Sequence, residues 1–253
     1  MPPVSLPARA AILAFGAFAY LAFLLAVAAG VDFVTGAGLV FRGIDGPPLA
    51  PVPAAVAIDV ALLALFGVSH SVMARESFKR AWTKLVPRAA ERSIYVLTSS
   101  ASLGLIFWQW RALPQPIWNA TSPGVRAAVW AVTAAGAALA VASTFLTNHF
   151  DLFGLRQVWL AARDRPYTPV AFKQRVLYRI VRHPMMLGFL LAFWVTPTMS
   201  VGHALFAAGM SAYVAIGIRF EERSLERQFG DEYRRYRRQV PAVIPFLRRR
   251  PSA

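Results

Sequence analysis

The feature that most constrains the fold is the length of the uncharged stretches. Residues 11–31 contain no Asp, Glu, Lys or Arg, and residues 183–218 form a longer stretch of the same kind. A helix needs about 20 apolar residues to cross a bilayer. Charges fall in blocks between such stretches, as in polytopic helical membrane proteins, whereas a β-barrel would show short segments of alternating polarity. We therefore predict an all-α integral membrane protein with one domain over residues 1–253.

The second stretch is too long for one crossing. As a single helix, residues 183–218 would reach about 54 Å, whereas the apolar core of a bilayer is about 30 Å thick. Thr196-Pro197-Thr198 lies near the middle, where proline breaks a helix. We predict a C-terminal helical hairpin with limbs at residues 183–195 and 203–218, the first short enough to be tilted or to cross only in part. Four other spans are predicted over residues 11–31, 52–73, 93–110 and 127–147.

The positive charges predict the side on which each loop lies. Six Lys and Arg residues lie in residues 74–92, seven in residues 148–182 and ten from Arg219 onward. Residues 32–51 hold one and residues 112–125 hold none. Cytoplasmic loops of membrane proteins carry such an excess of Lys and Arg. Both termini are therefore expected inside the cell.

Charge and composition also exclude some classes of protein. The net charge of +15 is explained by the basic loops and their contact with anionic headgroups, so membrane lipid is the expected partner and nucleic acid is not. The chain has no Cys, which excludes a disulfide framework, a thiolate nucleophile and a Cys-ligated metal. No metal site is predicted. Most of the unusual polar residues lie in residues 148–253, which we take as the cofactor-binding and catalytic part.

A first polar motif precedes the predicted hairpin and runs from Tyr178 to Gly188. Pro184 favours a helix start and restricts His183 to an extended conformation. The first turn of that helix offers unpaired N–H groups, which suit a carboxylate or another polar ligand group. The alternative is a plain interfacial helix start, with Arg182 and His183 as anchors that extend to the membrane surface.

A second motif follows the hairpin. Residues 219–229 continue the last membrane helix into water, and Gly230 is a plausible stop. Glu221 and Glu222 lie at the membrane boundary, where a carboxylate needs a partner such as a cation or a ribose diol. The alternative is a solvated amphipathic helix on the membrane surface.

Together these two motifs resemble the isoprenylcysteine carboxyl methyltransferase and phospholipid methyltransferase group. The resemblance covers residues 178–246 and rests on Arg-His-Pro-Met-Met-x-Gly, a hairpin, and Glu-Glu-x-x-Leu-x-x-x-Phe-Gly-x-x-Tyr-x-x-Tyr. Members of that group are membrane enzymes that use S-adenosylmethionine. The resemblance implies that one side of the cofactor is held by Tyr178, Arg182, His183, Pro184, Met185 and Gly188. It implies that the other side is closed by Glu221, Glu222, Tyr233 and Tyr236.

A third motif, residues 147–159, lies just past the inner end of the fourth predicted span. Its alternative explanation is a capped surface helix with Asp151 as the N-cap, His149 at the interface and Arg156 on lipid phosphate. The motif resembles the bacterial methanethiol S-methyltransferases, which make dimethyl sulfide, and implies a bacterial cytoplasmic membrane with the active site facing the cytoplasm. The catalytic candidates are His149, Asp151, Asn148 and His70. The candidates for the substrate pocket are Arg156, Gln157, Trp159 and Met186.

The resemblance implies an S_N2 transfer of a methyl group to a small thiol. A thiol with a pKa of about 8.5 or higher is mostly protonated at neutral pH, so a positioned base would help. We predict that His149 is this base, oriented by Asp151, with His70 as the second candidate. His70 lies eleven residues after Asp59 and therefore on nearly the same helix face. An intramembrane Asp is either functional or bonded to a neighbouring helix.

Three other functions stay open from the sequence. One is a related methyltransferase that acts on a lipid or on another thiol. Another is a membrane reductase that binds a nicotinamide cofactor with a similar hairpin and tail; no Gly-rich nucleotide-binding loop is present. The third is a haem or transporter subunit that uses His70, His149 and His183.

Overall fold

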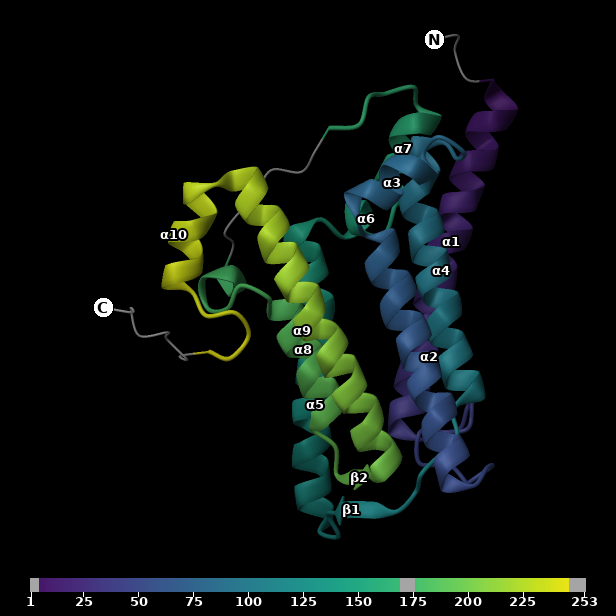
Figure 1. The fold of residues 1–253 in the computed structure, drawn as a ribbon, viewed down its shortest axis with the longest axis vertical. Coiled ribbons are helices and arrows are strands. Elements are labelled where there is room, and N and C mark those ends of the chain that lie inside the picture. The colour runs from purple at the N-terminus through teal and green to yellow at the C-terminus, as the bar shows by residue number, and fades with distance from the viewer. Residues whose placement is uncertain (1–4, 169–175, 246–253) are drawn as a thin grey trace. The chain divides into compact units, whose positions relative to one another are not determined.

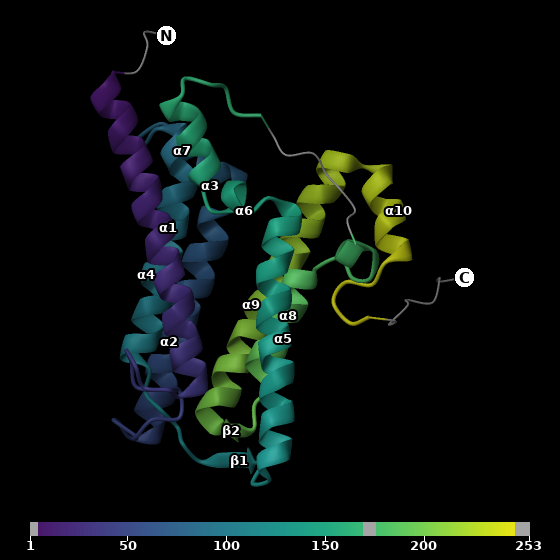
Figure 2. The same cartoon turned by 180° about the vertical axis from the view of Figure 1, so that it is seen from behind.

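The computed structural model describes residues 5–168 and 176–245. Five of the basic residues counted in the sequence lie outside the described residues, namely Lys173, Arg175, Arg248, Arg249 and Arg250. Figures 1 and 2 show a chain built almost entirely of helices. The elements are α1 (Leu6–Thr35), α2 (Val52–Met73), α3 (Glu76–Trp82), α4 (Arg88–Gln109), β1 (Pro116–Asn119), α5 (Pro123–Thr147), α6 (His149–Leu152), α7 (Leu155–Ala162), the 3₁₀ helix η1 (Val176–Arg179), α8 (Pro184–Trp194), β2 (Thr198–Ser200), α9 (Val201–Phe229) and α10 (Asp231–Gln239).

The predicted all-α class is confirmed. Within residues 5–168 and 176–245, four helices, α1, α2, α5 and α9, are long and apolar enough to cross a membrane. Residues 93–109 of the span predicted over residues 93–110 belong to α4, which is not among those four helices. The chain therefore has the helices of an integral membrane protein.

The helices form two compact units, which are described separately. Unit 1 contains Met1–Gln115 and Asn148–Val170, and unit 2 contains Pro116–Thr147 and Ala171–Ala253. The predicted catalytic part, residues 148–253, therefore does not coincide with one unit. Its first 23 residues fold with the N-terminal helices.

In unit 1, α1, α2 and α4 run side by side (Figure 1). Gly16 of α1 lets α7 approach closely, because a Cβ atom there would lie 2.4 Å from Cγ2 of Val158. Val158 is fully buried in this contact. Asp59 is also fully buried, and its carboxylate accepts a hydrogen bond from the backbone N–H of Arg111 at 2.9 Å. Asp59 therefore ties α2 to the end of α4. This agrees with the alternative in which the intramembrane Asp is bonded to a neighbouring helix.

In unit 2, α5 and α8 pack through glycines. A Cβ on Gly188 would lie 2.5 Å from the carbonyl oxygen of Gly136, and one on Gly136 would lie 2.7 Å from Cβ of Leu191. Small residues at a helix contact let the two backbones approach closely. The antiparallel pair β1–β2 links the chain before α5 to the chain after α8.

The predicted break at Thr196–Thr198 is confirmed, since α8 ends at Trp194 and β2 intervenes before α9. With 11 residues, α8 is about 16 Å long, roughly half the thickness of the apolar core. It contacts α9 through the ring pair Phe193–Phe206, at 5.5 Å between centroids.

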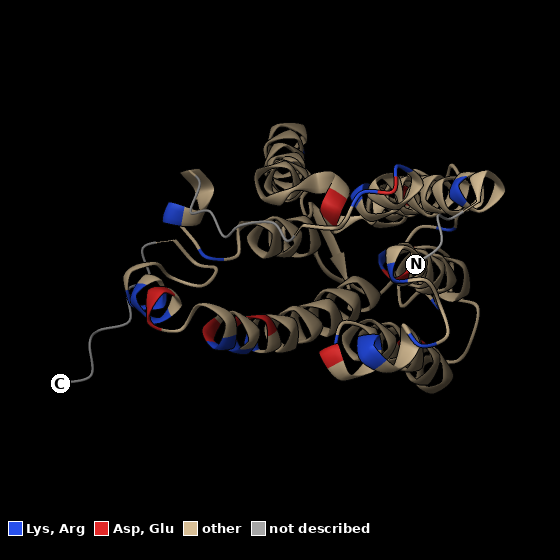
Figure 3. Ribbon diagram, turned by 90° about the horizontal axis from the view of Figure 1, so that it is seen from above, with Lys and Arg blue, Asp and Glu red and all other residues tan. Residues whose placement is uncertain are grey.

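The last long helix extends well past the apolar stretch. Its 29 residues reach about 43 Å. It ends at Phe229, and Gly230 follows with φ of 55°, as predicted from the glycine. Figure 3 shows that most of the helical ribbon carries no charge. The end of α9 and the arginine-rich α10 differ from the rest, because both carry many charged side chains. The charged residues of unit 2 are therefore concentrated in these two elements.

Candidate functional site

The first polar cluster joins the start of α8 to the charged end of α9. Arg182 donates to Oε1 of Glu222 from Nε at 2.8 Å and from Nη2 at 2.6 Å. Its Nη1 donates to the carbonyl oxygens of Arg237 and Val240 near the end of α10. One guanidinium therefore holds three elements together, which requires the planar multiple donors of Arg.

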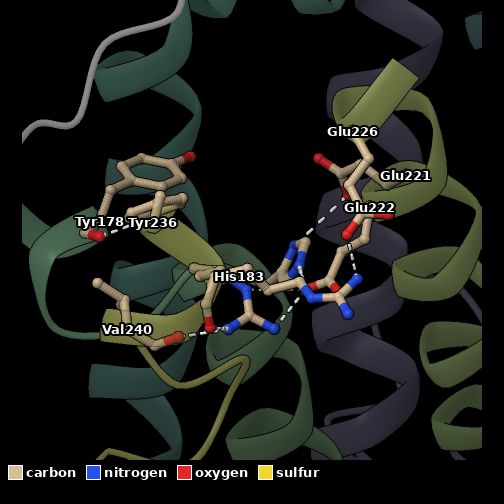
Figure 4. Close-up of polar contacts among 9 residues, drawn as sticks. Tyr178, His183, Glu221, Glu222, Glu226, Tyr236 and Val240 are labelled. Carbon is tan, nitrogen blue, oxygen red and sulfur yellow. Dashed lines mark hydrogen bonds and ion pairs between the residues drawn. The ribbon is translucent and has the colours of Figure 1, made fainter. Parts of the chain in front are cut away.

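His183 lies beside this guanidinium, as Figure 4 shows. Its Nε2 is 3.1 Å from Oε1 of Glu222, and its Nδ1 is 3.5 Å from Oε2 of Glu221. Burial lowers the pKa of His183, but the hydrogen bonds to Glu221 and Glu222 outweigh it and raise the pKa to about 9. His183 is therefore an imidazolium at neutral pH.

The two carboxylates differ in what they can still bind. The side chain of Glu222 is 14% exposed, and its Oε1 already faces both Arg182 and His183. The side chain of Glu221 is 51% exposed and contacts only the edge of the imidazole among its described ion pairs. Glu221 is therefore the carboxylate that a ligand can reach, whereas Glu222 holds the cluster together.

The tyrosines of α10 are enclosed. Tyr233 and Tyr236 are 1% and 4% exposed, and their rings meet edge to face. The hydroxyl of Tyr236 donates to the carbonyl oxygen of Tyr178 at 2.6 Å, and the hydroxyl of Tyr178 lies 2.7 Å from that of Thr147. These contacts seat α10 on η1 and seat η1 on the end of α5. Of the three tyrosines, Tyr178 is half-buried and is the one nearest the surface.

The predicted helix start at Pro184 is confirmed, with His183 as the N-cap in an extended conformation. Met185 and Met186 follow in the first turn and are half-buried. Gly188 is buried against α5. Helix packing alone therefore requires glycine at this position, and the cofactor contact expected there stays a prediction.

The second polar cluster belongs to unit 1 and is an elbow formed by α6 and α7. Asn148 caps α6, because its side chain accepts a hydrogen bond from the N–H of Asp151 at 3.2 Å. The alternative that gave the cap to Asp151 is therefore wrong. Gly154, with φ of 87°, turns the chain between the two helices, and a Cβ there would lie 2.8 Å from Oγ of Ser93. Arg92 fixes the same elbow by donating to the carbonyl oxygen of Leu152 at 2.7 Å.

His149 is the buried member of the elbow, with 7% of its surface exposed. Its Nε2 lies 2.7 Å from the hydroxyl of Tyr20 in α1. Phe153 packs against the imidazole at 4.8 Å between ring centroids and stacks on Phe23. Burial lowers the pKa of His149, so its ring is neutral at neutral pH.

The carboxylate of Asp151 has partners that the sequence did not indicate. Arg156 donates to it at 2.8 Å, and the hydroxyl of Tyr167 donates to it at 3.2 Å. Gln157 donates to the backbone carbonyl of Asp151 at 3.0 Å. Trp159 is 48% exposed and stacks under Arg163. The polar residues of this motif therefore brace the elbow around His149.

The predicted site residues therefore fall into two groups. The cofactor candidates and Met186 lie in unit 2, whereas His149, Asp151, Asn148, Arg156, Gln157, Trp159 and His70 lie in unit 1. His70, the second candidate base, is bound through Nδ1 to the hydroxyl of Ser99 at 2.9 Å. Sequence reasoning missed Tyr20 and Arg92. Tyr20 is the only polar side chain in residues 10–31, and that isolation is the signal that could have pointed to it.

Comparison with known proteins supports the resemblance that these motifs suggested. The model of the NnrU protein family matches residues 60–247. The methanethiol S-methyltransferase of Mycobacterium tuberculosis is 49% identical over 235 residues, which cover 93% of this chain and 96% of the relative. The chain belongs to the family of the methanethiol S-methyltransferases. The resemblance to methanethiol S-methyltransferases is therefore confirmed.

Two other relatives show the same extent of similarity. The methanethiol S-methyltransferase of Crocosphaera subtropica is 43% identical over 241 residues, covering 94% of this chain and 93% of the relative. Methanethiol S-methyltransferase 2 of Bradyrhizobium diazoefficiens is 45% identical over 248 residues, covering 96% and 94%. No solved structure matches the chain. The methyltransferase family is thus shown by sequence over nearly the whole length.

Proposed function

We propose that the protein methylates methanethiol to dimethyl sulfide, with S-adenosylmethionine as methyl donor. The observation that carries this proposal is identity of 43–49% to methanethiol S-methyltransferases over at least 93% of the chain. The names of these relatives state a methyl transfer to methanethiol, which requires a methyl donor. When bound, S-adenosylmethionine supplies an electrophilic methyl group on a sulfonium sulfur.

The residues of unit 2 fit the polar part of this donor. Glu221 presents an accessible carboxylate, and Tyr178 presents a half-buried aromatic ring in the same unit. A carboxylate suits the amine or the ribose hydroxyls of the donor. Glu222, Arg182 and His183 hold that carboxylate in place by fixing the ends of α8 and α9. Glu221 and Tyr178 are thus our first choice for donor contacts, with Met185 and Met186 as apolar neighbours.

The chemistry on the thiol side requires loss of a proton. An alkyl thiol holds its proton at neutral pH, and a positioned base is typically worth about 10²–10⁴-fold in rate. His149 is neutral because of burial and therefore accepts a proton at that pH. The apolar ring of Phe153 packs against the imidazole and stacks on Phe23, and these two rings shield that side of His149. A dry environment favours a reaction in which a thiolate and a sulfonium lose their charges.

The membrane arrangement belongs to the same proposal. We place the chain in the bacterial cytoplasmic membrane, with both termini and the donor-binding cluster on the cytoplasmic side and with α8 and α9 as the two limbs of a hairpin. The count of Lys and Arg in the loops supports this orientation. A cytoplasmic cluster would give a water-soluble donor direct access.

The deciding experiment measures product and cofactor together. Detergent-purified protein is given methanethiol and S-adenosylmethionine with a labelled methyl group, and the headspace is analysed by gas chromatography. Labelled dimethyl sulfide above a boiled control is the expected result. Donor binding by calorimetry without volatile product would move the acceptor to a lipid or a larger thiol. Neither binding nor product would overturn the proposal and favour the reductase or haem alternatives.

A further inference from the structure

The hydroxyl of Tyr20 occupies an unusual position. It is the only polar side chain between Arg9 and Asp32 in α1, and a polar group inside a membrane helix is costly unless it has a partner or a function. Eleven residues separate it from Arg9, about 16 Å along the helix axis. Arg9 forms an ion pair with Asp164 at 3.0 Å. Tyr20 and its partner His149 therefore lie well inward of that ion pair.

The hydroxyl of Tyr20 covers one nitrogen of His149. The distance of 2.7 Å between Oη and Nε2 is that of a strong hydrogen bond and leaves no space for another atom between them. His149 is 7% exposed, whereas Tyr20 is only half-buried. A small molecule that exchanges a proton with Nε2 must therefore do so through the phenol oxygen.

The charged groups around this pair are engaged with other partners. On α4, Arg92 donates to the carbonyl oxygen of Leu152. On α7, Arg156 pairs with Asp151, the carboxylate of the elbow itself. On α1, Tyr20 is the titratable residue that contacts the imidazole. The phenol is thus the described group that covers Nε2 of His149 and that can exchange a proton with it.

We propose that Tyr20 is a catalytic residue that relays the proton of the substrate thiol to His149. The inference rests on the proposed function. As the S–H bond breaks, the thiol proton passes to Oη of Tyr20 while the Tyr20 proton passes to Nε2 of His149. The thiol sulfur forms the new bond to the methyl carbon and displaces the donor sulfur, which keeps the electron pair of the broken bond. The imidazolium then returns its extra proton to water through the same hydroxyl.

The test compares Tyr20→Phe, His149→Ala and the double variant, with Tyr213→Phe in α9 as a matched control outside both clusters. If Tyr20 relays the proton, Tyr20→Phe lowers turnover of methanethiol at pH 7 by at least about tenfold. The same variant leaves donor binding unchanged. The double variant is no slower than the slower single variant, because both remove the same step. A double variant whose loss is the product of the two single losses would overturn the relay.

A second substrate separates chemistry from structural damage. Hydrogen sulfide is smaller than methanethiol and much more acidic, so most of it is ionised at pH 8 and needs no base. The ratio of wild-type to Tyr20→Phe rates is expected to fall toward one with hydrogen sulfide. An equal deficit with both substrates would show that the hydroxyl only supports the fold. No transfer by the wild-type protein to either thiol would instead overturn the proposed function.

Discussion

At the scale of single residues, two adjacent carboxylates of α9 make different contacts. Glu221 and Glu222 are adjacent in the sequence, and both were expected to bind the cofactor. The structure directs Oε1 of Glu222 to Arg182 and His183 and leaves half of the Glu221 side chain exposed. A helix turns about 100° per residue, so two adjacent side chains face different surroundings.

Replacement of the two carboxylates should therefore give different results. Glu222→Gln removes the charge that pairs with Arg182 and should destabilise the protein by about 3 kcal/mol, since a mostly buried cation loses its partner. Glu221→Gln removes a half-exposed partner of His183, so it should lower the melting temperature much less than Glu222→Gln and should weaken donor binding by at least about tenfold. Thermal unfolding and calorimetry on both variants test this assignment. Weaker binding in Glu222→Gln alone would reverse it.

The charge of His183 should make the protein sensitive to alkaline pH. The folded-state pKa of about 9 lies above the ordinary value of about 6.5, so the contribution to stability is full below pH 6.5 and is lost as pH rises through 9. We expect the melting temperature to fall between pH 7 and pH 10, and to fall less in His183→Gln. A variant with the same pH profile as the wild type would contradict the paired imidazolium.

His149 and His70 are the two candidate bases, and replacement distinguishes them. His149→Ala should lower turnover by at least about tenfold while donor binding stays intact, because only proton removal is affected. If His70→Ala gives the larger loss in kcat, the assignment moves to His70. Both variants need the same headspace assay and the same calorimetry.

At the scale of elements, close helix contacts position the polar clusters. Gly16 brings α7 against α1, and Gly154 turns the elbow onto α4. The contact of Gly136 with Gly188 brings α8 against α5. It thereby fixes where His183, at the start of α8, lies along α5. These glycines act on function through helix packing.

The glycine contact gives a prediction with an internal control. Gly188→Ala would place a Cβ 2.5 Å from a backbone oxygen of α5 and should cost about 1–3 kcal/mol. Gly217→Ala in α9 adds a Cβ where nothing lies within 4 Å and should be neutral or stabilise by up to about 1 kcal/mol. Melting temperatures of the two variants, measured in one detergent, give the comparison. Equal effects would argue against close packing of α5 and α8.

At the scale of the whole molecule, the open question is the membrane orientation. The chain has no Cys, so single cysteines can be introduced and labelled without a background. Ser122→Cys, before α5, should react with an impermeant maleimide added to intact cells. Ser224→Cys, at the charged end of α9, should react only after permeabilisation. The opposite pattern would reverse the proposed orientation.

The sequence by itself determined the helical membrane class, the bounds of α2, the start of α8 at Pro184 and the end of α9 before Gly230. These follow from the length of apolar runs and from proline and glycine, which act locally on the backbone. The family also followed from sequence, because its motifs are short and ordered. Only the tertiary structure decided that Glu222 is committed to Arg182 and that Gly188 is a packing residue. The same holds for the contact of Tyr20 with His149, since 129 residues separate them and no local pattern encodes a contact made by packing.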